Sequence, residues 1–218
     1  MSRRDPYLYE DVPVLKNLPG IKDSEALKRV EGDLTRMSMG IVYAREYEKF
    51  NTDTLCDIHR TIFGGLYEWA GEFRTIPIMK YEEVLGGDTV HYALPSEIKK
   101  QLDQTSREIA KLKPTRAKKD IVFKIVRITA AIWQTHPFRE GNTRSVVAFS
   151  VLLAAKLGVD VRIITPGIPD KNAVYAVTRS DYVGLVQNGV RICEYTPGFC
   201  HAKQCVCDGI IASIGTSN

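Results

Sequence analysis

Nine consecutive residues, His136 to Arg144, carry the side chains best suited to chemistry, in the order His-Pro-Phe-Arg-Glu-Gly-Asn-Thr-Arg. The imidazole of His136 has an ordinary pKa of about 6.5, so it can take a proton from an attacking hydroxyl at neutral pH. Glu140 offers a hard oxygen ligand to a magnesium ion that carries phosphates, and the guanidinium of Arg144 can donate two hydrogen bonds to phosphate oxygens. Because phosphoryl-type transfer asks a protein mainly for positioning and charge neutralisation, the run indicates a site for that chemistry.

Two predicted helices flank this run. Apolar residues recur at helical spacing over residues 121–133, and Pro137 disfavours helical backbone at the residue before it, so a helix should end at His136. Asn142 is a suitable N-cap for a second, largely buried helix over residues 143–157. The run is therefore a loop between two core helices.

The start of the second helix should bind an anion. Its first N–H groups have no partner within the helix and carry the positive end of the helix dipole. The turn at residues 140–143 should attract a polyphosphate, with Arg144 in the first helical turn beside it.

The run resembles the signature of the Fic/Doc family, His-Pro-Phe-x-Asp/Glu-Gly-Asn-x-Arg, and eight of its nine positions are as the usual adenylyl transferases of that family have them. Residues 20–31, residues 63–74 and the helix that leads into His136 resemble other parts of the family in the expected order. The resemblance covers roughly Asp5 to Gln187.

The resemblance implies a mainly α fold, a Fic-type helical bundle with one β-hairpin flap. The Fic domain would take residues 21–187, with the flap at about 73–93 and the motif loop at 136–144. An irregular arm, 1–20, would precede it and an appendage, 188–218, would follow. Periodicity and breakers predict the hairpin as the only clear strand element and helices at 24–49, 52–63, 95–112, 117–135, 143–157 and 170–186.

The resemblance also implies roles for the motif residues. Such proteins move AMP from ATP onto a hydroxyl of a target protein and release pyrophosphate. His136 would be the general base and Glu140 the ligand of Mg²⁺, while Phe138 would anchor the loop in the core. The α-phosphate would be held with the help of Asn142 and the outer phosphates by Arg144. The residues expected to bind the nucleotide are Arg139, Gly141, Asn142, Thr143 and Arg144.

Thr143 departs from the commonest pattern. Many adenylyl transferases have glycine there, and the Doc branch has a lysine that accompanies transfer of the γ-phosphate. Since no lysine stands in the turn, we favour a protein adenylyltransferase. The alternatives are a Doc-like protein kinase, another nucleotidyl transferase that uses the same loop, and a catalytically lapsed interaction domain.

The predicted flap is a candidate binding element for the target. Residues 73–79 and 89–92 are rich in β-formers, and residues 85–88 read as a turn between them. An open strand edge can pair with an extended segment of another chain, although Pro77 limits which edge can do so. The alternative is a hairpin that only packs on the helices. Small bacterial members of the family are often toxins, so a type II topoisomerase subunit is a first candidate target.

Inhibition is expected from a separate chain. Many Fic proteins are inhibited by a helix with the pattern Ser/Thr-x-x-x-Glu-Gly/Asn, whose glutamate pairs with the residue that matches Arg144. Here no serine or threonine precedes a glutamate by four places, and Glu31-Gly32 has Leu27 at the hydroxyl position. We therefore expect a small antitoxin helix in trans, with Glu31 as an internal alternative.

Composition predicts one compact domain of 218 residues, 44% hydrophobic and 26% charged. The net charge of +4, from 30 basic and 26 acidic residues, is too balanced for a specific nucleic-acid surface. The basic segment 111–119 contains no aromatic residue to stack on a base and is interpreted as a solvated loop. No run of about 18 apolar residues could cross a membrane and no signal peptide is visible, so we expect a cytoplasmic protein.

Two further groups of residues are interpreted as structural or incidental. His59 lies on the apolar face of the helix at 52–63 and should be a structural hydrogen-bonding group, and His91 has no metal-ligand neighbours at the usual spacing. Four of the five cysteines lie in the last 26 residues, in a spacing that is unusual for zinc. We interpret that tail as a loose appendage with incidental thiols at Cys193, Cys200, Cys205 and Cys207.

Overall fold

The structure is a computed structural model, and it describes residues 5–81, 89–114, 118–168, 172–197, 204–207 and 211–214. Most of these residues lie in helices, as predicted for a mainly α fold. The six helices are α1 (Ser24–Ala44), α2 (Thr52–Phe63), α3 (Pro95–Ile109), α4 (Lys118–Thr135), α5 (Asn142–Lys156) and α6 (Asn172–Gln187). The strands are β1 (Met79–Tyr81), β2 (Thr89–His91), β3 (Arg162–Pro166), β4 (Arg191–Tyr195), β5 (Gln204–Cys207) and β6 (Ile211–Ile214).

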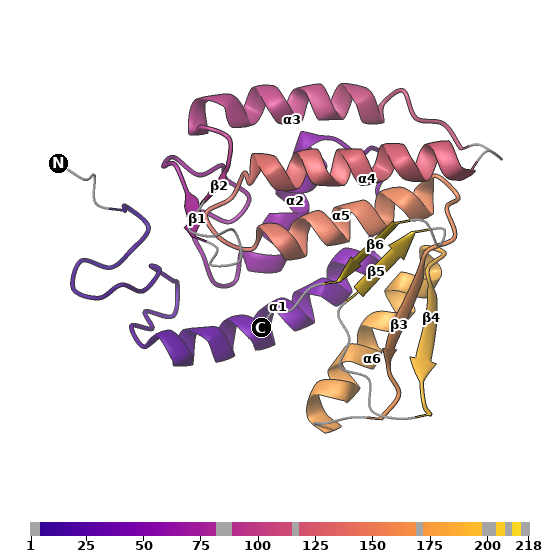
Figure 1. The fold of residues 1–218 in the computed structure, drawn as a ribbon. Coiled ribbons are helices and arrows are strands. Elements are labelled where there is room, and N and C mark those ends of the chain that lie inside the picture. Colours follow the sequence, from indigo (N-terminus) through magenta and orange to yellow (C-terminus); the bar gives the residue numbers. More distant parts are fainter. Residues whose placement is uncertain are drawn as a thin grey trace.

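Helices α2 to α5 form a bundle, and α1 crosses below it (Figure 1). Helix α2 illustrates how an apolar face places a helix in the bundle. Leu55, Ile58 and Ile62 recur along one face and are 1% exposed or less, so this face enters the core. Asn51 caps the helix, because its side chain accepts the N–H of Thr54 at 3.0 Å. The core continues to the motif loop through Phe138, which is completely buried.

Several predicted helix boundaries need correction. The bounds of α2 were predicted correctly, but α1 ends at Ala44 rather than Lys49. Arg45 takes an extended conformation and donates to Asp57 and Thr61 of α2, both at 3.0 Å. The chain needs this stretch in order to reverse direction before α2.

The predicted hairpin is present but shorter. Strands β1 and β2 pair antiparallel, with Lys80 opposite Val90. The first strand was predicted over residues 73–79, which is wrong for 73–78. There the backbone N–H of Arg74 donates to Pro137, and the carbonyl of Ile76 accepts the side chain of Arg74, so these groups bond outside a strand ladder. The turn predicted at 85–88 lies outside the described residues.

The prediction that the hairpin is the only strand element is wrong. Strands β3 and β4 pair in parallel, with α6 as the crossover between them, and β5 pairs antiparallel with β6. Partners in a parallel pair are far apart in sequence, so the local pattern did not reveal them. Three strands lie after residue 187, where the sequence predicted a loose appendage. The limits of the predicted domains stay predictions.

Helix α6 packs closely on α1 at two glycines. A Cβ on Gly184 would come within 2.7 Å of the backbone of Tyr43 and Ala44, and one on Gly40 within 2.8 Å of Asp181 Oδ1. Asn188, just after α6, donates to the carbonyl of Tyr43. The C-terminal β–α–β segment is therefore attached to the long N-terminal helix. No helix in the described part of the chain combines the length and apolarity that a membrane crossing requires.

Candidate active site

The motif loop joins the end of α4 to the start of α5. The N–H of His136 still donates to Ile132 of α4 at 3.1 Å, but its φ of 49° turns the chain out of the helix. Among the described residues it is the one non-glycine with a left-handed φ, a conformation that is uncommon outside glycine. Phe138 then enters the core and stacks on His59 with 3.8 Å between ring centroids. Phe138 is thus the core anchor that the sequence predicted.

Asn142 closes the loop on itself. Its side-chain oxygen accepts the N–H of Phe138 at 2.9 Å, and its amide nitrogen donates to the Phe138 carbonyl at 2.8 Å. The prediction of Asn142 as the N-cap is therefore wrong by one residue: Gly141 holds that position, with φ 76°, and α5 begins at Asn142. Contact between Asn142 and an α-phosphate stays a prediction.

Gly141 allows the loop to approach Phe63. A Cβ at Gly141 would lie 2.2 Å from the Phe63 ring, and the positive φ also favours glycine. The Phe63 ring lies beneath the turn and also faces the guanidinium of Arg144, with 4.7 Å from its carbon to the ring centroid. One aromatic side chain therefore supports both the anion turn and its cation.

The start of α5 has the features of an anion site. No side chain of the described residues caps it, and the N–H of Ser145 makes the first bond within the helix, to Gly141 at 3.2 Å. The preceding N–H groups are therefore available to a ligand. Glu140 accepts the N–H of Gly141 at 3.0 Å, and Thr143 is exposed at the start of the helix.

His59 fixes the other side of the loop. Its Nε2 lies 2.9 Å from the carbonyl of Glu140, and its Nδ1 accepts the N–H of Gly71 at 2.8 Å. Nε2 must therefore carry the proton. Burial, followed by the nearby positive charges of Arg144 and Arg60, lowers the pKa of His59 to about 4, although the bond to Glu140 opposes this shift. His59 is neutral at pH 7 and acts structurally, as predicted.

The imidazole of His136 is held by the flap. Its ring stacks on that of Tyr92, just after β2, with 3.9 Å between centroids and 19° between planes. Gln134 of α4 donates to the carbonyl of His91, the last residue of β2. The candidate base is therefore packed against the residue that follows the second strand of the flap.

Arg144 is engaged by α1. Its guanidinium forms an ion pair with Glu31 and donates to Thr35 at 3.0 Å. The second oxygen of the Glu31 carboxylate accepts the hydroxyl of Tyr67 at 2.5 Å. The side chains of Arg144 and Glu31 are 35% and 17% exposed, so solvent only partly screens this pair. The internal alternative considered from the sequence is thus the contact present in the structure.

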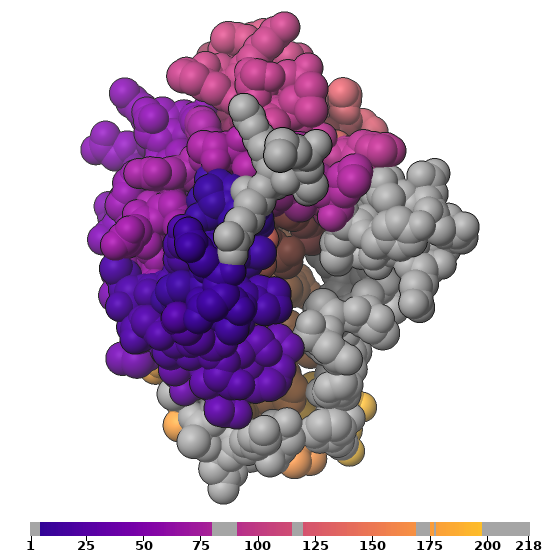
Figure 2. All heavy atoms as spheres, turned by 90° about the vertical axis from the view of Figure 1, so that its left-hand side faces the viewer, coloured from indigo at the N-terminus to yellow at the C-terminus, as the bar shows by residue number. Residues whose placement is uncertain are grey.

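Arg139 is also paired, with Asp5 of the N-terminal arm. Its Nη2 and Nε lie 2.7 Å and 3.0 Å from the same carboxylate oxygen, and both side chains are about four-fifths buried. The arm is held further by Tyr7, whose hydroxyl accepts the N–H of Thr75 at 3.0 Å. In the face shown in Figure 2, the arm and α1 lie in front of the later helices. Both arginines of the loop are therefore neutralised by N-terminal carboxylates.

The donor set suits magnesium bound through phosphates. Mg²⁺ commonly uses one or two carboxylates together with substrate oxygens rather than a cage of protein ligands. Glu140 is half-buried and lies beside the anion turn. In the described part of the chain no cluster of three or more acidic, histidine or cysteine side chains could hold a metal without a substrate.

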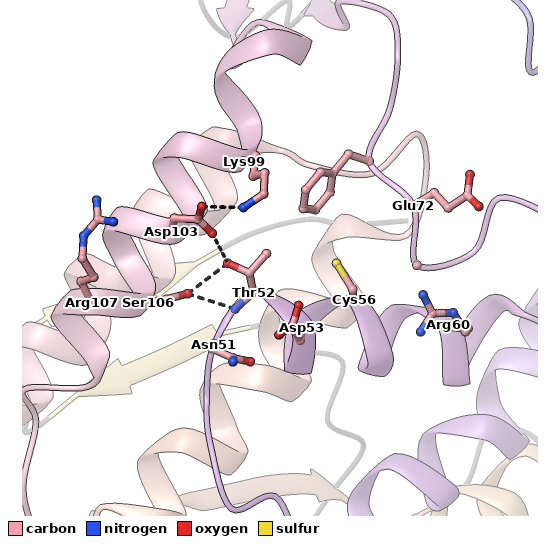
Figure 3. A pocket seen from close by; sticks show the side chains of 12 residues that line it. Asn51, Thr52, Asp53, Cys56, Arg60, Glu72, Lys99, Asp103, Ser106 and Arg107 are labelled. Carbon is pink, nitrogen blue, oxygen red and sulfur yellow. Dashed lines mark hydrogen bonds and ion pairs between the residues drawn. The ribbon is translucent and has the colours of Figure 1, made fainter.

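A separate cavity of about 750 Å³ lies between α2, α3 and the segment before the flap. Figure 3 shows that four of its polar side chains contact one another: Thr52 contacts Asp103 and Ser106, and Lys99 pairs with Asp103 at 2.7 Å. No motif residue lines it. We assign no ligand to this cavity.

Sequence reasoning brought the motif residues together correctly but missed several of their partners. Phe63 was predicted as part of the apolar face of the helix at 52–63, and Arg74 was noted only as part of a resembling segment. A cation between the β-formers Phe73 and Thr75 could have drawn attention to Arg74, since a charge in such a run needs a partner. The stacking of Tyr92 on His136 has no sequence signal, because the two residues are 44 positions apart.

A family model described as the Fic/DOC family matches residues 49–154. The protein adenylyltransferase VbhT of Bartonella schoenbuchensis is 30% identical over an alignment of 167 residues, and the match covers 72% of this chain and 32% of that protein. This part of the chain belongs to the Fic/DOC family. The motif loop between α4 and α5 is therefore a Fic loop, and β1 and β2 lie where the predicted Fic flap was placed.

Solved structures agree with the Fic fold. The type IV secretion system effector BepA is 30% identical, with a TM-score of 0.60 over 70% of this chain and 55% of that one. The BepC protein of Bartonella tribocorum, with bound AMPPNP, is 26% identical, with a TM-score of 0.59 over 70% and 78% of the two chains. The Fic domain of an effector from Bartonella sp. AR 15-3 reaches a TM-score of 0.65 at 20% identity.

The C-terminal part matches a different family. A model described as a cardiolipin synthase, PLD-like domain matches residues 121–218. The cardiolipin synthase of Halalkalibacterium halodurans is 43% identical over 88 residues, which are 40% of this chain and 17% of that enzyme. The cysteine spacing of the tail gave no sign of this similarity. The chain spans less than a third of VbhT and about a sixth of the synthase.

Proposed function

We propose that the protein is a protein adenylyltransferase, which transfers AMP from ATP to a hydroxyl side chain of a target protein. One observation carries the proposal: a candidate base, His136, ends one helix while the next helix begins uncapped, with a glycine turn and Arg144 beside it. The similarity to VbhT and to BepC with its bound nucleotide supports the same class of reaction.

In this reaction the target hydroxyl oxygen attacks the α-phosphorus of ATP, and its proton passes to the imidazole of His136. The bond between the α-phosphorus and the oxygen that bridges to the β-phosphorus breaks, and pyrophosphate leaves. The N–H groups at the start of α5 would hold the phosphates, with Arg144 neutralising the outer ones. Arg139, Gly141, Asn142 and Thr143 complete the proposed nucleotide site.

Glu140 would hold the magnesium ion, which neutralises charge on the phosphates when it is bound. His59 then has a function in the proposed reaction, because its bond to the Glu140 carbonyl sets the position of that residue. The Glu140 carboxylate accepts the N–H of Gly141 at 3.0 Å, so it already lies beside the anion turn where the ion would be held.

We further propose that the structure represents an inhibited state. Glu31 occupies Arg144, so an incoming γ-phosphate must displace it. Inhibition in cis is favoured by this contact over the small antitoxin helix expected from the resemblance. An antitoxin helix in trans would have to take Arg144 from Glu31.

The proposed target binds along the flap, by adding an extended segment to the open edge of β1 or β2. A type II topoisomerase subunit remains the first candidate for a toxin of this kind. We place the reaction in the cytoplasm, since the proposed donor is ATP.

The C-terminal match favours a second candidate function, transfer chemistry on phospholipids, through the 43% identity to a cardiolipin synthase. The matched part is 17% of that enzyme, so we propose this activity only for a larger assembly that supplies the rest. Mass spectrometry of bacterial phospholipid vesicles incubated with the chain tests it. New cardiolipin formed by the chain alone would contradict the need for a larger assembly.

Intact-mass measurement tests the main proposal. The chain is incubated with Mg²⁺, ATP and each candidate target, beside His136→Ala and, as a control away from the flap, Glu25→Gln, which alters an exposed side chain of α1. We expect a target mass increased by one AMP, lost in His136→Ala and retained in Glu25→Gln. An added phosphate would instead establish the Doc-like kinase. Labelling that persists in His136→Ala would remove the proposed base.

A further inference from the structure

Arg74, in the segment before the flap, is a buried cation without a carboxylate partner among the described residues. It is 2% exposed, and all its hydrogen bonds go to backbone carbonyls. A buried charge is costly unless its surroundings satisfy it well. The four carbonyls that accept these hydrogen bonds lie at the end of α4 and at the two ends of the flap.

Two acceptors lie at the end of α4. The Nε–H of Arg74 donates to the carbonyl of His136 at 2.7 Å, and Nη2 lies 3.3 Å from that of Thr135. The backbone N–H of Arg74 donates to Pro137 at 2.8 Å. One residue thus engages three consecutive carbonyls around the candidate base. A positive charge here also stabilises the negative end of the α4 dipole.

The other two acceptors lie at the two ends of the flap. Nη1 donates to the carbonyl of Ile76 at 2.7 Å, before β1, and Nη2 donates to that of Ala93, after β2. Because the guanidinium is planar, its donors hold the flap ends and the His136 carbonyl in one fixed arrangement. A lysine has a single nitrogen and cannot reproduce this fork.

We propose that Arg74 is a positioning residue that couples the flap to His136, so that a target segment added to the flap edge presents its hydroxyl to the imidazole. The inference rests on the proposed AMP transfer. The left-handed φ of His136 fits this role, since a strained backbone persists only where its surroundings determine it. Arg74 touches neither the Glu140–Arg144 turn nor the nucleotide site, so its effect should be confined to alignment.

The test compares the full chain with Arg74→Lys, Arg74→Met and a matched control, Arg45→Lys, whose side chain is 47% exposed. Three quantities are measured: affinity for AMPPNP, kcat and KM for a modified target, and the NMR signals of the His136 ring. Assignment is simple because the chain has 4 histidines. Arg74→Met removes the charge together with its burial cost and provides a folded variant where Arg74→Lys does not.

We expect AMPPNP affinity to stay within about twofold, kcat to fall about 100-fold and the His136 signals to shift in both Arg74 variants, as for a misplacement near 1 Å. Arg45→Lys should behave like the wild type. Unchanged His136 signals and rates would overturn the proposal. Equal losses of nucleotide binding and of transfer would also overturn it, because they indicate only a loss of folded protein. Failure of both Arg74 variants to fold would overturn it as well.

The proposed function can fail separately. If the wild-type chain transfers no AMP to any target, the His136 signals and the hydrogen exchange of the β2 amides still decide the role of Arg74. A shift of these signals together with faster exchange in both variants supports the coupling. Unchanged signals and exchange overturn it.

Discussion

Two histidines close to the motif have opposite roles because their surroundings differ. His59 is completely buried, and both its ring nitrogens are engaged by the backbone. His136 is half-buried at the end of α4 and stacks against the flap. A ring that is fixed in the neutral form by two backbone bonds cannot serve as a base, whereas a ring beside an anion turn can.

Burial of neutral His59 predicts a loss of stability in acid. The folded pKa of about 4 lies below the ordinary 6.5, so between these values the unfolded chain binds more protons. Stability from this group is complete above pH 6.5 and falls as the pH drops toward 4, by at most about 3–4 kcal/mol at about 1.4 kcal/mol per pKa unit. Urea unfolding across this range measures it.

The test variant for this measurement is His59→Gln, and the control is His91→Gln. Burial raises the pKa of Asp181 to about 6, which stabilises the fold at low pH and opposes His59 in the same window. The difference between the wild type and His59→Gln therefore isolates the histidine. We expect a flatter acid slope in His59→Gln and an unchanged slope in His91→Gln. Equal slopes in all three proteins would show that His59 is not buried and neutral.

At the scale of residues, the sequence predicted the candidate catalytic side chains better than it predicted the residues that contact them. His136, Glu140 and Arg144 are adjacent in sequence, so one motif was enough to find them. Arg74 is 62 positions from His136, and its acceptors are backbone carbonyls that leave no trace in side-chain types. Such contacts follow only from the fold.

At the scale of elements, α1 carries the groups that occupy Arg144. Glu31 and Thr35 are one turn apart on the same helical face, so both reach the guanidinium. From the sequence, Glu31 was an alternative partner for Arg144. An inhibitory helix from a separate chain was favoured, because Leu27 stands where the inhibitory pattern has a serine or threonine. Two residues that the inhibitory sequence pattern does not include stabilise the ion pair of Glu31 and Arg144. Thr35 accepts a hydrogen bond from Arg144, and Tyr67 donates one to Glu31.

Glu31→Gln is expected to raise AMP transfer and ATP affinity. A charge-assisted hydrogen bond contributes about 1.5–3 kcal/mol, so its removal should favour nucleotide binding by roughly 10- to 100-fold. Nucleotide titration and intact-mass labelling measure the two effects. Glu25→Gln is the control on the same helix, where the exposed glutamate pairs with Lys28. Equal activities of both variants would favour inhibition in trans.

Helices were predicted more successfully than strands. The bounds of α2 follow from its cap at Asn51 and its apolar face, both of which are local features. The residues predicted as the first flap strand are instead tied to Arg74, and β3 pairs with β4 across α6. Tertiary hydrogen bonds decided both cases, and propensity alone does not contain them.

At the scale of the whole molecule, two family matches overlap across the motif loop. The Fic/DOC match ends at residue 154 and the cardiolipin synthase match begins at 121, so most of α4, the motif loop and most of α5 lie in both. The first turn of α5 carries Arg144, and the end of α5 leads to β3. The later segment returns to the Fic part through α6, which packs on α1. We therefore expect the position of Glu31 to depend in part on the C-terminal segment.

Replacement of Gly184 by alanine tests this dependence. The new Cβ would lie 2.7 Å from the backbone of Tyr43 and Ala44, so α6 and α1 must separate. We expect a loss of about 1–3 kcal/mol of stability, or about 2–4 °C of Tm for each kcal/mol, and increased AMP transfer as Glu31 withdraws. Calorimetry and labelling measure the two effects. Gly65→Ala, where a Cβ meets nothing within 4 Å, is the control. A Tm and an activity equal to those of the wild type would show that α6 does not pack on α1 in solution. They would also show that the C-terminal segment does not affect the Fic site.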